Sequence, residues 1–111
     1  MLFGDKSAEI EKLAQKKNSA KLVAMIQDKK PEIRLQAIKA LGTVGDDTAI
    51  NALINLFTAP DTDTKIAAIK SAGGSGRQVI KSHLQYMIQT ETNENVKAAI
   101  REALAKIPNK N

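Results

Sequence analysis

The chain has 111 residues and no cysteine, which suits one folded unit and excludes disulfides, thiolate metal sites and cysteine nucleophiles. Apolar residues make up 42% of the sequence and aromatic residues only 3%, so the core must be built from aliphatic side chains. The net charge of +5 is compatible with nucleic acid or another acidic partner, and equally with an ordinary solvated surface.

The first predicted element is an amphipathic helix over about residues 6–17. Its apolar residues Ile10, Leu13 and Ala14 recur three and four positions apart and therefore share one side of a helix. Asn18 is expected to end it.

Three further predicted helices are more apolar than the first one. They cover Ser19–Gln27, Thr48–Phe57 and Gln78–Gln89. A helix with a wide apolar face is covered on more than one side, so we expect these three to be sandwiched between other helices.

A phrase of nine residues alternates with these helices and occurs three times. It reads IRLQAIKAL at Ile33–Leu41, TKIAAIKSA at Thr64–Ala72 and VKAAIREAL at Val96–Leu104. In each copy the second position is basic, the fifth apolar and the eighth small. Small and apolar residues at this spacing form one helical face, so the phrase predicts three helices built on one plan.

Each of these three helices has a start signal, and the first two also have a stop signal. A proline or capping side chains precede the helices, and glycines that tolerate a left-handed backbone follow the first two. The signals are Pro31, Asp61–Thr64 and Thr92–Asn95 at the starts, and Gly42, Gly45, Gly73, Gly74 and Gly76 at the ends. The repeating unit is therefore helix, short turn, helix, glycine turn.

This unit occurs three times, over about residues 19–45, 46–76 and 77–107 of a single domain, 1–111. Neither helix of a pair can bury its apolar face alone, but stacked pairs build a continuous core. We therefore predict an all-α fold, a right-handed α-solenoid of three helical hairpins in which the leading helix is an N-terminal cap.

The segment DKKPEIRLQAIKALGTVGDDTAINAL, residues 28–53, resembles the HEAT-like repeat of the short, bacterial, phycobilisome-lyase type. The features that carry the resemblance are Ile33-Arg34, Ala37, Ala40-Leu41-Gly42 and Gly45-Asp46. The second copy departs from the pattern at Thr64, Ala72 and Arg77, and the third stops at Ile107-Pro108. The resemblance implies a solenoid whose second helices line a concave face, mostly in scaffolds that hold another protein. A minority of such proteins bind nucleic acid or act on chromophores or damaged bases.

No motif in the sequence predicts a catalytic centre, a cofactor or a metal site. His83 is the only histidine, and we interpret it as a partly buried structural residue. Asp46, Asp47, Asp61 and Asp63 all fall at helix starts, where capping and the helix dipole account for them. We therefore predict a protein that is not an enzyme.

Basic residues on the repeated helices are the best functional lead. Equal positions of a solenoid stack into columns, so Arg34, Lys65 and Lys97 are expected to form one cationic column. Lys39 and Lys70 would begin a second one. The acids placed to pair with the first column are Asp28, Asp63 and Glu94. The first column is thus either paired structurally or free for a partner, whereas the second has no evident acidic column beside it.

We hypothesise a small non-catalytic adaptor that binds a protein or peptide, in particular an acidic one, on the concave face. The expected contact residues are Arg34, Ile38, Lys39, Lys65, Ile69, Lys70, Lys97 and Arg101, with a core position as the alternative for both isoleucines. The alternative function is non-specific nucleic-acid binding by the same basic face, although Tyr86 is the only candidate for base stacking. A third hypothesis, an enzyme related to the chromophore lyases, would require a deep pocket with titratable groups.

Two further expectations concern location and self-association. No apolar run reaches the roughly 18 residues that suggest a membrane span, and the N-terminus lacks the apolar run of a signal peptide. A cytoplasmic location is therefore expected. The apolar Met1–Gly4 stretch would pack on the first helix pair or mediate self-association, and the Ala-rich Ala98–Ile107 segment offers a second self-association site.

Overall fold

The computed structural model describes residues 6–108, which contain seven α-helices, one short 3-10 helix and no strand. The elements are α1 (Lys6–Gln15), α2 (Ser19–Met25), α3 (Pro31–Val44), α4 (Asp47–Asn55), the 3-10 helix η1 (Leu56–Thr58), α5 (Thr62–Ser75), α6 (Gln78–Thr90) and α7 (Glu94–Lys106). The Met1–Gly4 stretch lies outside the described residues.

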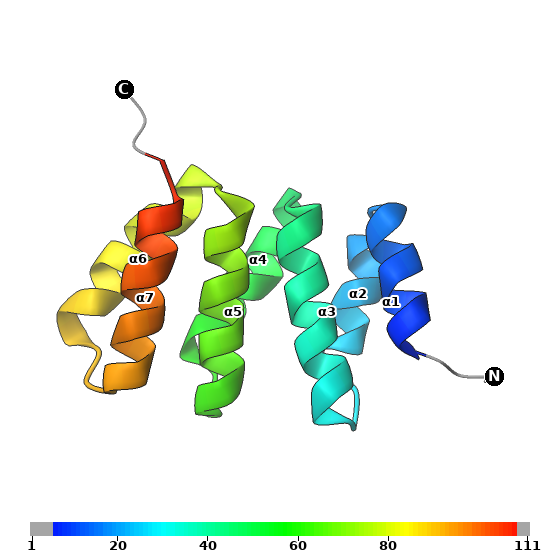
Figure 1. The fold of residues 1–111 in the computed structure, drawn as a ribbon, viewed down its shortest axis with the longest axis horizontal. Coiled ribbons are helices and arrows are strands. Elements are labelled where there is room, and N and C mark those ends of the chain that lie inside the picture. Colours follow the sequence, from blue (N-terminus) through cyan, green and yellow to red (C-terminus); the bar gives the residue numbers. More distant parts are fainter. Residues whose placement is uncertain (1–5, 109–111) are drawn as a thin grey trace.

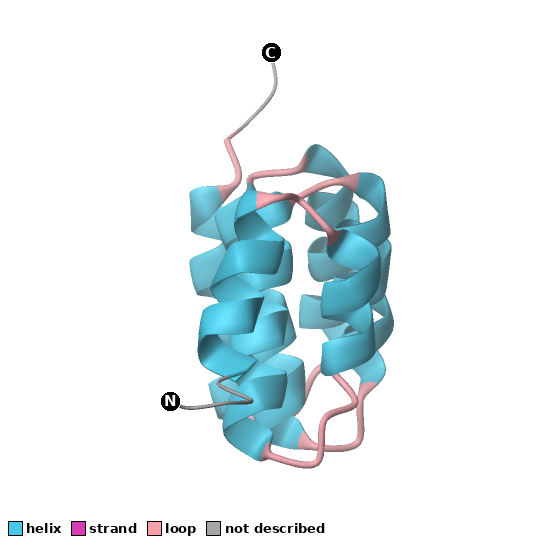
Figure 2. Ribbon diagram, turned by 90° about the vertical axis from the view of Figure 1, so that its right-hand side faces the viewer, coloured by secondary structure: helices cyan, strands magenta, loops and turns pink. Residues whose placement is uncertain are grey.

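The helices form two layers. Helices α1, α3, α5 and α7 lie side by side in one layer, and α2, α4 and α6 form the other (Figures 1 and 2). Each helix of the second layer packs against the helix that follows it in the chain, and α3 and α5 also pack along both of their neighbours in the first layer. The described residues therefore form an α-solenoid of stacked helical pairs preceded by one single helix. The all-helical solenoid prediction is confirmed.

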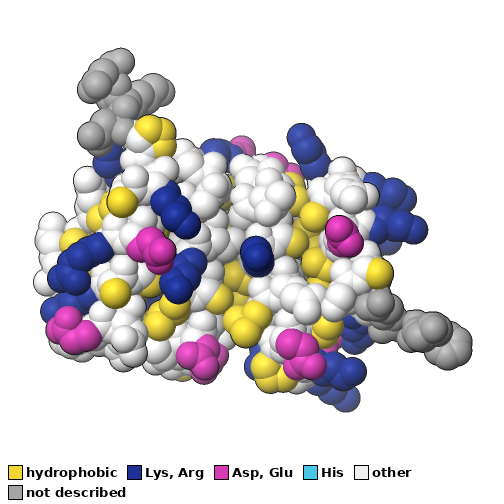
Figure 3. All heavy atoms as spheres, in the orientation of Figure 1, with side chains coloured by type: hydrophobic (Ala, Val, Ile, Leu, Met, Phe, Trp, Pro, Cys, Tyr) yellow, Lys and Arg dark blue, Asp and Glu magenta, His cyan; other side chains and the backbone are white. Residues whose placement is uncertain are grey.

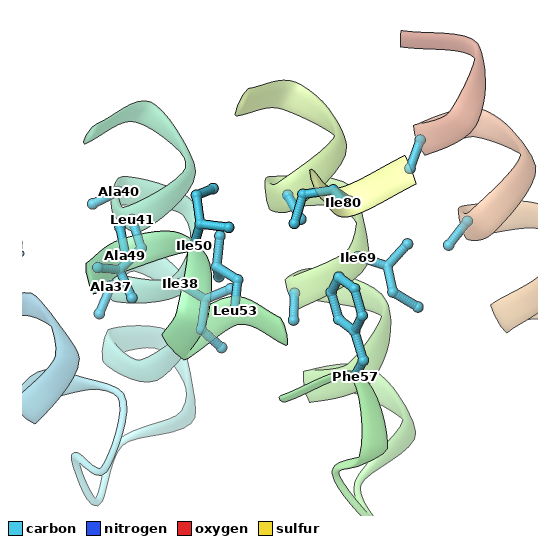
Figure 4. Close-up of a cluster of buried hydrophobic side chains, with 14 of the residues drawn as sticks. Ala37, Ile38, Ala40, Leu41, Ala49, Ile50, Leu53, Phe57, Ile69 and Ile80 are labelled. Atoms are coloured by element: carbon cyan, nitrogen blue, oxygen red, sulfur yellow. The ribbon is translucent and has the colours of Figure 1, made fainter. Parts of the chain in front are cut away.

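One aliphatic core runs through the stack. Ile38 and Leu41 of α3 are buried together with Ile50 and Leu53 of α4, and Phe57 adds the aromatic ring of this cluster (Figure 4). Burying one such side chain contributes about 1.5–3 kcal/mol, and short isolated helices are marginal in water. The stability of each helix therefore depends on the helices stacked against it.

Glycines let the helices of the first layer approach closely. A Cβ atom added to Gly42 would overlap the backbone oxygen of Ser71, and one added to Gly73 would lie 2.7 Å from the Cα of Ala103. Ser71 Oγ also donates a hydrogen bond of 2.7 Å to the backbone oxygen of Ile38. In the other layer α4 and α6 touch only slightly. We refer to this more closely packed layer, which contains α3, α5 and α7, as the inner layer.

Side chains also join the turns before α4 and α6. Asp46 caps α4 and accepts a hydrogen bond of 3.0 Å from Ser19 Oγ. In the next repeat Arg77 occupies the N-cap position of α6, where it donates to the Gly45 backbone oxygen at 2.6 Å and to Asp47 Oδ1 at 2.7 Å. Arg77, which departs from the repeat pattern, thus links the turn before α6 to the turn before α4.

Lys17 holds a backbone conformation that glycine adopts elsewhere in the stack. Its φ of 57° follows α1, whereas α3 and α5 are followed by Gly45 and Gly76 at 65° and 70°. A left-handed backbone is costly for a residue with a Cβ. We therefore expect Lys17→Gly to raise the free energy of unfolding by about 0.5–1 kcal/mol in urea denaturation. Lys12→Gly, inside α1, should lower it by a similar amount, and a loss of stability in Lys17→Gly would contradict the assignment.

Candidate functional site

Two predicted contact residues are core residues instead. Ile38 is 1% exposed and Ile69 is 0% exposed, and both belong to the central hydrophobic cluster in Figure 4. Ile38 lies three residues before buried Leu41, and Ile69 lies three residues before buried Ala72, so each shares the buried face of its helix. Their assignment to the contact surface was wrong, and the core alternative is correct.

Arg34, the first member of the first cationic column, serves the fold. Its Nη1 atom donates hydrogen bonds to the backbone oxygens of Asp28 at 2.9 Å and Lys29 at 3.1 Å. Arg34 therefore has a structural role, which was one of the two alternatives. Its partners are backbone oxygens of the turn between α2 and α3, however, and not the Asp28 carboxylate.

The other two members of the first column form ion pairs. Lys97 pairs with Glu94 at 3.4 Å, as the sequence indicated. Lys65 pairs with Glu91 at 3.7 Å instead of with Asp63, because the turn before α7 brings Glu91 alongside α5. The first column is thus engaged in structural contacts along its length.

Two carboxylates make the stability dependent on pH. The Lys6 ammonium donates to Asp28 at 2.5 Å and lowers the pKa of that carboxyl below its usual 3.8, and hydrogen bonds from Thr64 lower the pKa of Asp61. A carboxyl with a lowered folded-state pKa stabilises the fold above its unfolded pKa, and this contribution is lost as the pH falls through the folded value. We expect the free energy of unfolding to fall between about pH 5 and pH 2, and to fall less in the Asp28→Asn/Asp61→Asn variant. Urea denaturation at several pH values measures both slopes, and equal slopes would refute this origin.

A groove lies between α3 and α5 on the inner layer and has a volume of about 490 Å³. Its lining is mostly small and apolar, with three lysines. The lining residues are Leu35, Lys39, Gly42, Thr43, Ala67, Lys70, Ser71, Gly74 and Lys106. Leu35 is 40% exposed, which is unusual for a large apolar side chain of this protein. Figure 3 shows the face to which these helices belong, where hydrophobic side chains lie between scattered lysines and arginines.

The three lysines of the groove have no ion-pair partner within residues 6–108. Lys39, Lys70 and Lys106 are exposed, and their ammonium groups form no ion pair or side-chain hydrogen bond with that part of the chain. No carboxylate lines the groove. A groove lined by three lysines and by small and apolar residues suits a ligand that carries both negative charge and an apolar group.

Sequence reasoning found Lys39 and Lys70 but missed Leu35, Gly74 and Lys106. Leu35 had a detectable signal, because it is a large apolar residue placed off the buried stripe of its helix. Lys106 had none, since it lies in the last turn of α7, in the repeat that follows that of α5.

A second hollow of about 530 Å³ lies between α5 and α7. It shares Lys70 with the groove, and its other lining residues are Ile66, Asn95, Ala98, Ala99 and Glu102. Glu102 occupies the position in its repeat that Lys39 and Lys70 hold in theirs. Arg101 is exposed but lines neither hollow. The second cationic column therefore ends in a carboxylate and does not extend across all three repeats.

His83 is exposed on α6, so its assignment as a partly buried residue was wrong. It lies one residue before buried Leu84 and therefore points away from the core. Between residues 6 and 108 no group of three His, Cys, Asp or Glu side chains could hold a metal ion. None of the helices in the same span combines the length and the apolar character needed to cross a bilayer.

Comparison with protein families agrees with this architecture. A family model described as HEAT repeats matches residues 19–105, which is more than half of the chain. The chain belongs to the HEAT repeat family. HEAT repeats are generally scaffolds for protein interactions and typically lack enzymatic activity. The match begins at α2 and leaves out α1, the helix without a partner of its own pair. A comparison with curated proteins gave no match.

Proposed function

We propose that this HEAT repeat chain is a non-catalytic adaptor that binds a protein segment on its inner layer. The groove between α3 and α5 is the observation that carries this proposal. It presents the exposed Leu35 beside Lys39 and Lys70, whose charges have no partner within residues 6–108. An exposed apolar residue with polar side chains around it matches the apolar core and polar rim of protein-binding surfaces. The general role of the family as a protein scaffold supports the same function.

Non-specific nucleic-acid binding has weaker support. Phosphate backbones favour an extended row of cations, and single-stranded nucleic acid also favours aromatic stacking platforms. The first cationic column is engaged in contacts within the fold, and the second ends at Glu102. Tyr86, which is 71% exposed, lies on α6 in the other layer. Nucleic acid is therefore an outcome to be tested, and not the proposed ligand.

A peptide-display selection on the purified protein tests the adaptor function. Peptides enriched on the wild type should bind the Lys39→Glu/Lys70→Glu variant at least about tenfold more weakly. The matched control is Lys21→Glu/Lys29→Glu, which changes the net charge equally at two exposed lysines outside the groove. It should retain binding. Equal binding by both variants would remove the groove from the proposal. A single-stranded oligonucleotide bound at low salt, with no enriched peptide, would support the nucleic-acid alternative.

A further inference from the structure

Gly74 lines the groove without a structural reason for being glycine. The other glycines of the described residues have one: Gly45 and Gly76 have a left-handed backbone, and Gly42 and Gly73 lie against a neighbouring helix. A Cβ atom added at Gly74 would meet nothing within 4 Å, and Gly74 lies in the last turn of α5 without a left-handed φ. Glycine is a poorer helix former than alanine, so this position gives up stability without easing any contact in the fold.

The missing side chain at Gly74 leaves open space in the lining of the groove. Gly74 lies one turn beyond Lys70 on α5, and Gly42 and Thr43 line the same groove from α3. Glycine is the residue that allows a ligand to approach a backbone closely. Leu35 and Ala67 complete an apolar surface within this groove of about 490 Å³, which exceeds the space that one apolar side chain needs.

Charge defines the rest of the ligand. Lys39, Lys70 and Lys106 line the same groove as the apolar residues, and no acidic residue lines it. Lysine ammonium groups act as flexible point charges that attract carboxylates and phosphates alike, whereas bidentate recognition of either group favours arginine. No arginine lines the groove. The groove therefore attracts anions without bidentate recognition, and on a partner protein the available anions are the carboxylates of Asp and Glu side chains.

We infer that the groove between α3 and α5 binds an acidic peptide segment with one large apolar side chain. The apolar side chain lies over Gly74 and against Leu35 and Ala67, and the flanking carboxylates pair with Lys39, Lys70 and Lys106. This inference depends on the proposed adaptor function and adds the chemistry of the partner and the position of its anchor.

The test uses a synthetic fluorescein-labelled peptide in which one leucine is flanked by two Asp or Glu residues on each side. Fluorescence anisotropy of the full-length chain should show saturable binding with a Kd below about 1 mM. Replacing the acids by their amides, or the leucine by serine, should each weaken binding at least about tenfold. Gly74→Ala should also weaken binding about tenfold, while its melting temperature rises by about 2–5 °C. If Gly74 had only a structural role, its replacement by alanine would not weaken binding while raising the melting temperature.

Several results would overturn the inference. They are no binding of the acidic leucine peptide, unchanged binding by its amide or serine version, or wild-type affinity of Gly74→Ala. If display-selected peptides of another composition still require Lys39 and Lys70, the adaptor function stands and only the ligand chemistry is wrong. If no displayed peptide binds, both proposals fail. An oligonucleotide that binds through these lysines when the acidic peptide does not would replace the inferred ligand.

Discussion

Replacing Ile69 with alanine is expected to lower the free energy of unfolding by about 2–5 kcal/mol. Ile69 is 0% exposed and belongs to the hydrophobic cluster shared by the stacked helices. Its truncation removes buried apolar surface and leaves a cavity, because the surrounding helices can relax only partly. Urea denaturation followed by circular dichroism measures the loss. The same change at Ile38, which is 1% exposed, should have a similar cost.

Ile66→Ala is the matched control for this prediction. Ile66 lies on the same helix but is only partly buried and lines the hollow between α5 and α7. Its truncation should cost clearly less, because less apolar surface is lost from the core. If Ile69→Ala and Ile66→Ala had equal effects, Ile69 would not be a core residue. Because Ile69 is buried and cannot contact a peptide, weaker peptide binding by Ile69→Ala would reflect loss of folded protein.

The helices could be predicted because their signals are local. Apolar residues recur three and four positions apart, and Pro31 and the glycines at 45 and 76 mark helix ends directly. The end of the first helix was less accurate. It was expected near residue 17, but α1 ends at Gln15, and Lys17 has a left-handed backbone. A lysine in the sequence does not indicate this conformation, whereas a glycine would.

The groove could not be predicted in the same way, because it depends on the distance between two helices. That distance is set where Gly42 meets Ser71, two residues far apart in the chain. Position around a helix was a second source of error. One residue corresponds to about 100° of rotation, which separates buried Ile38 from exposed Lys39.

The right-handed sense of the stack, the boundaries of the three repeats, the phycobilisome-lyase type, self-association and the cytoplasmic location stay predictions.

Replacing Gly42 with alanine is expected to lower the free energy of unfolding by about 1–3 kcal/mol, although alanine is the better helix former. The added Cβ would overlap the Oγ and the backbone oxygen of Ser71 and would lie 3.0 Å from its carbonyl carbon. A backbone atom cannot rotate away as a side chain can. Helix α5 must therefore move away from α3, which strains the hydrogen bond from Ser71 Oγ to the Ile38 oxygen.

A double variant separates the backbone clash from the side-chain clash. Gly42→Ala/Ser71→Ala removes the Oγ without weakening the helix but keeps the backbone oxygen, so it should recover little of the lost stability. Gly74→Ala is the matched control, since the same substitution in open space on the facing helix should raise stability. Urea denaturation of all three variants decides the matter. A stabilising Gly42→Ala would show that α3 and α5 are not held together at this point. The close packing that places Lys39 and Lys70 on one groove would then need another cause.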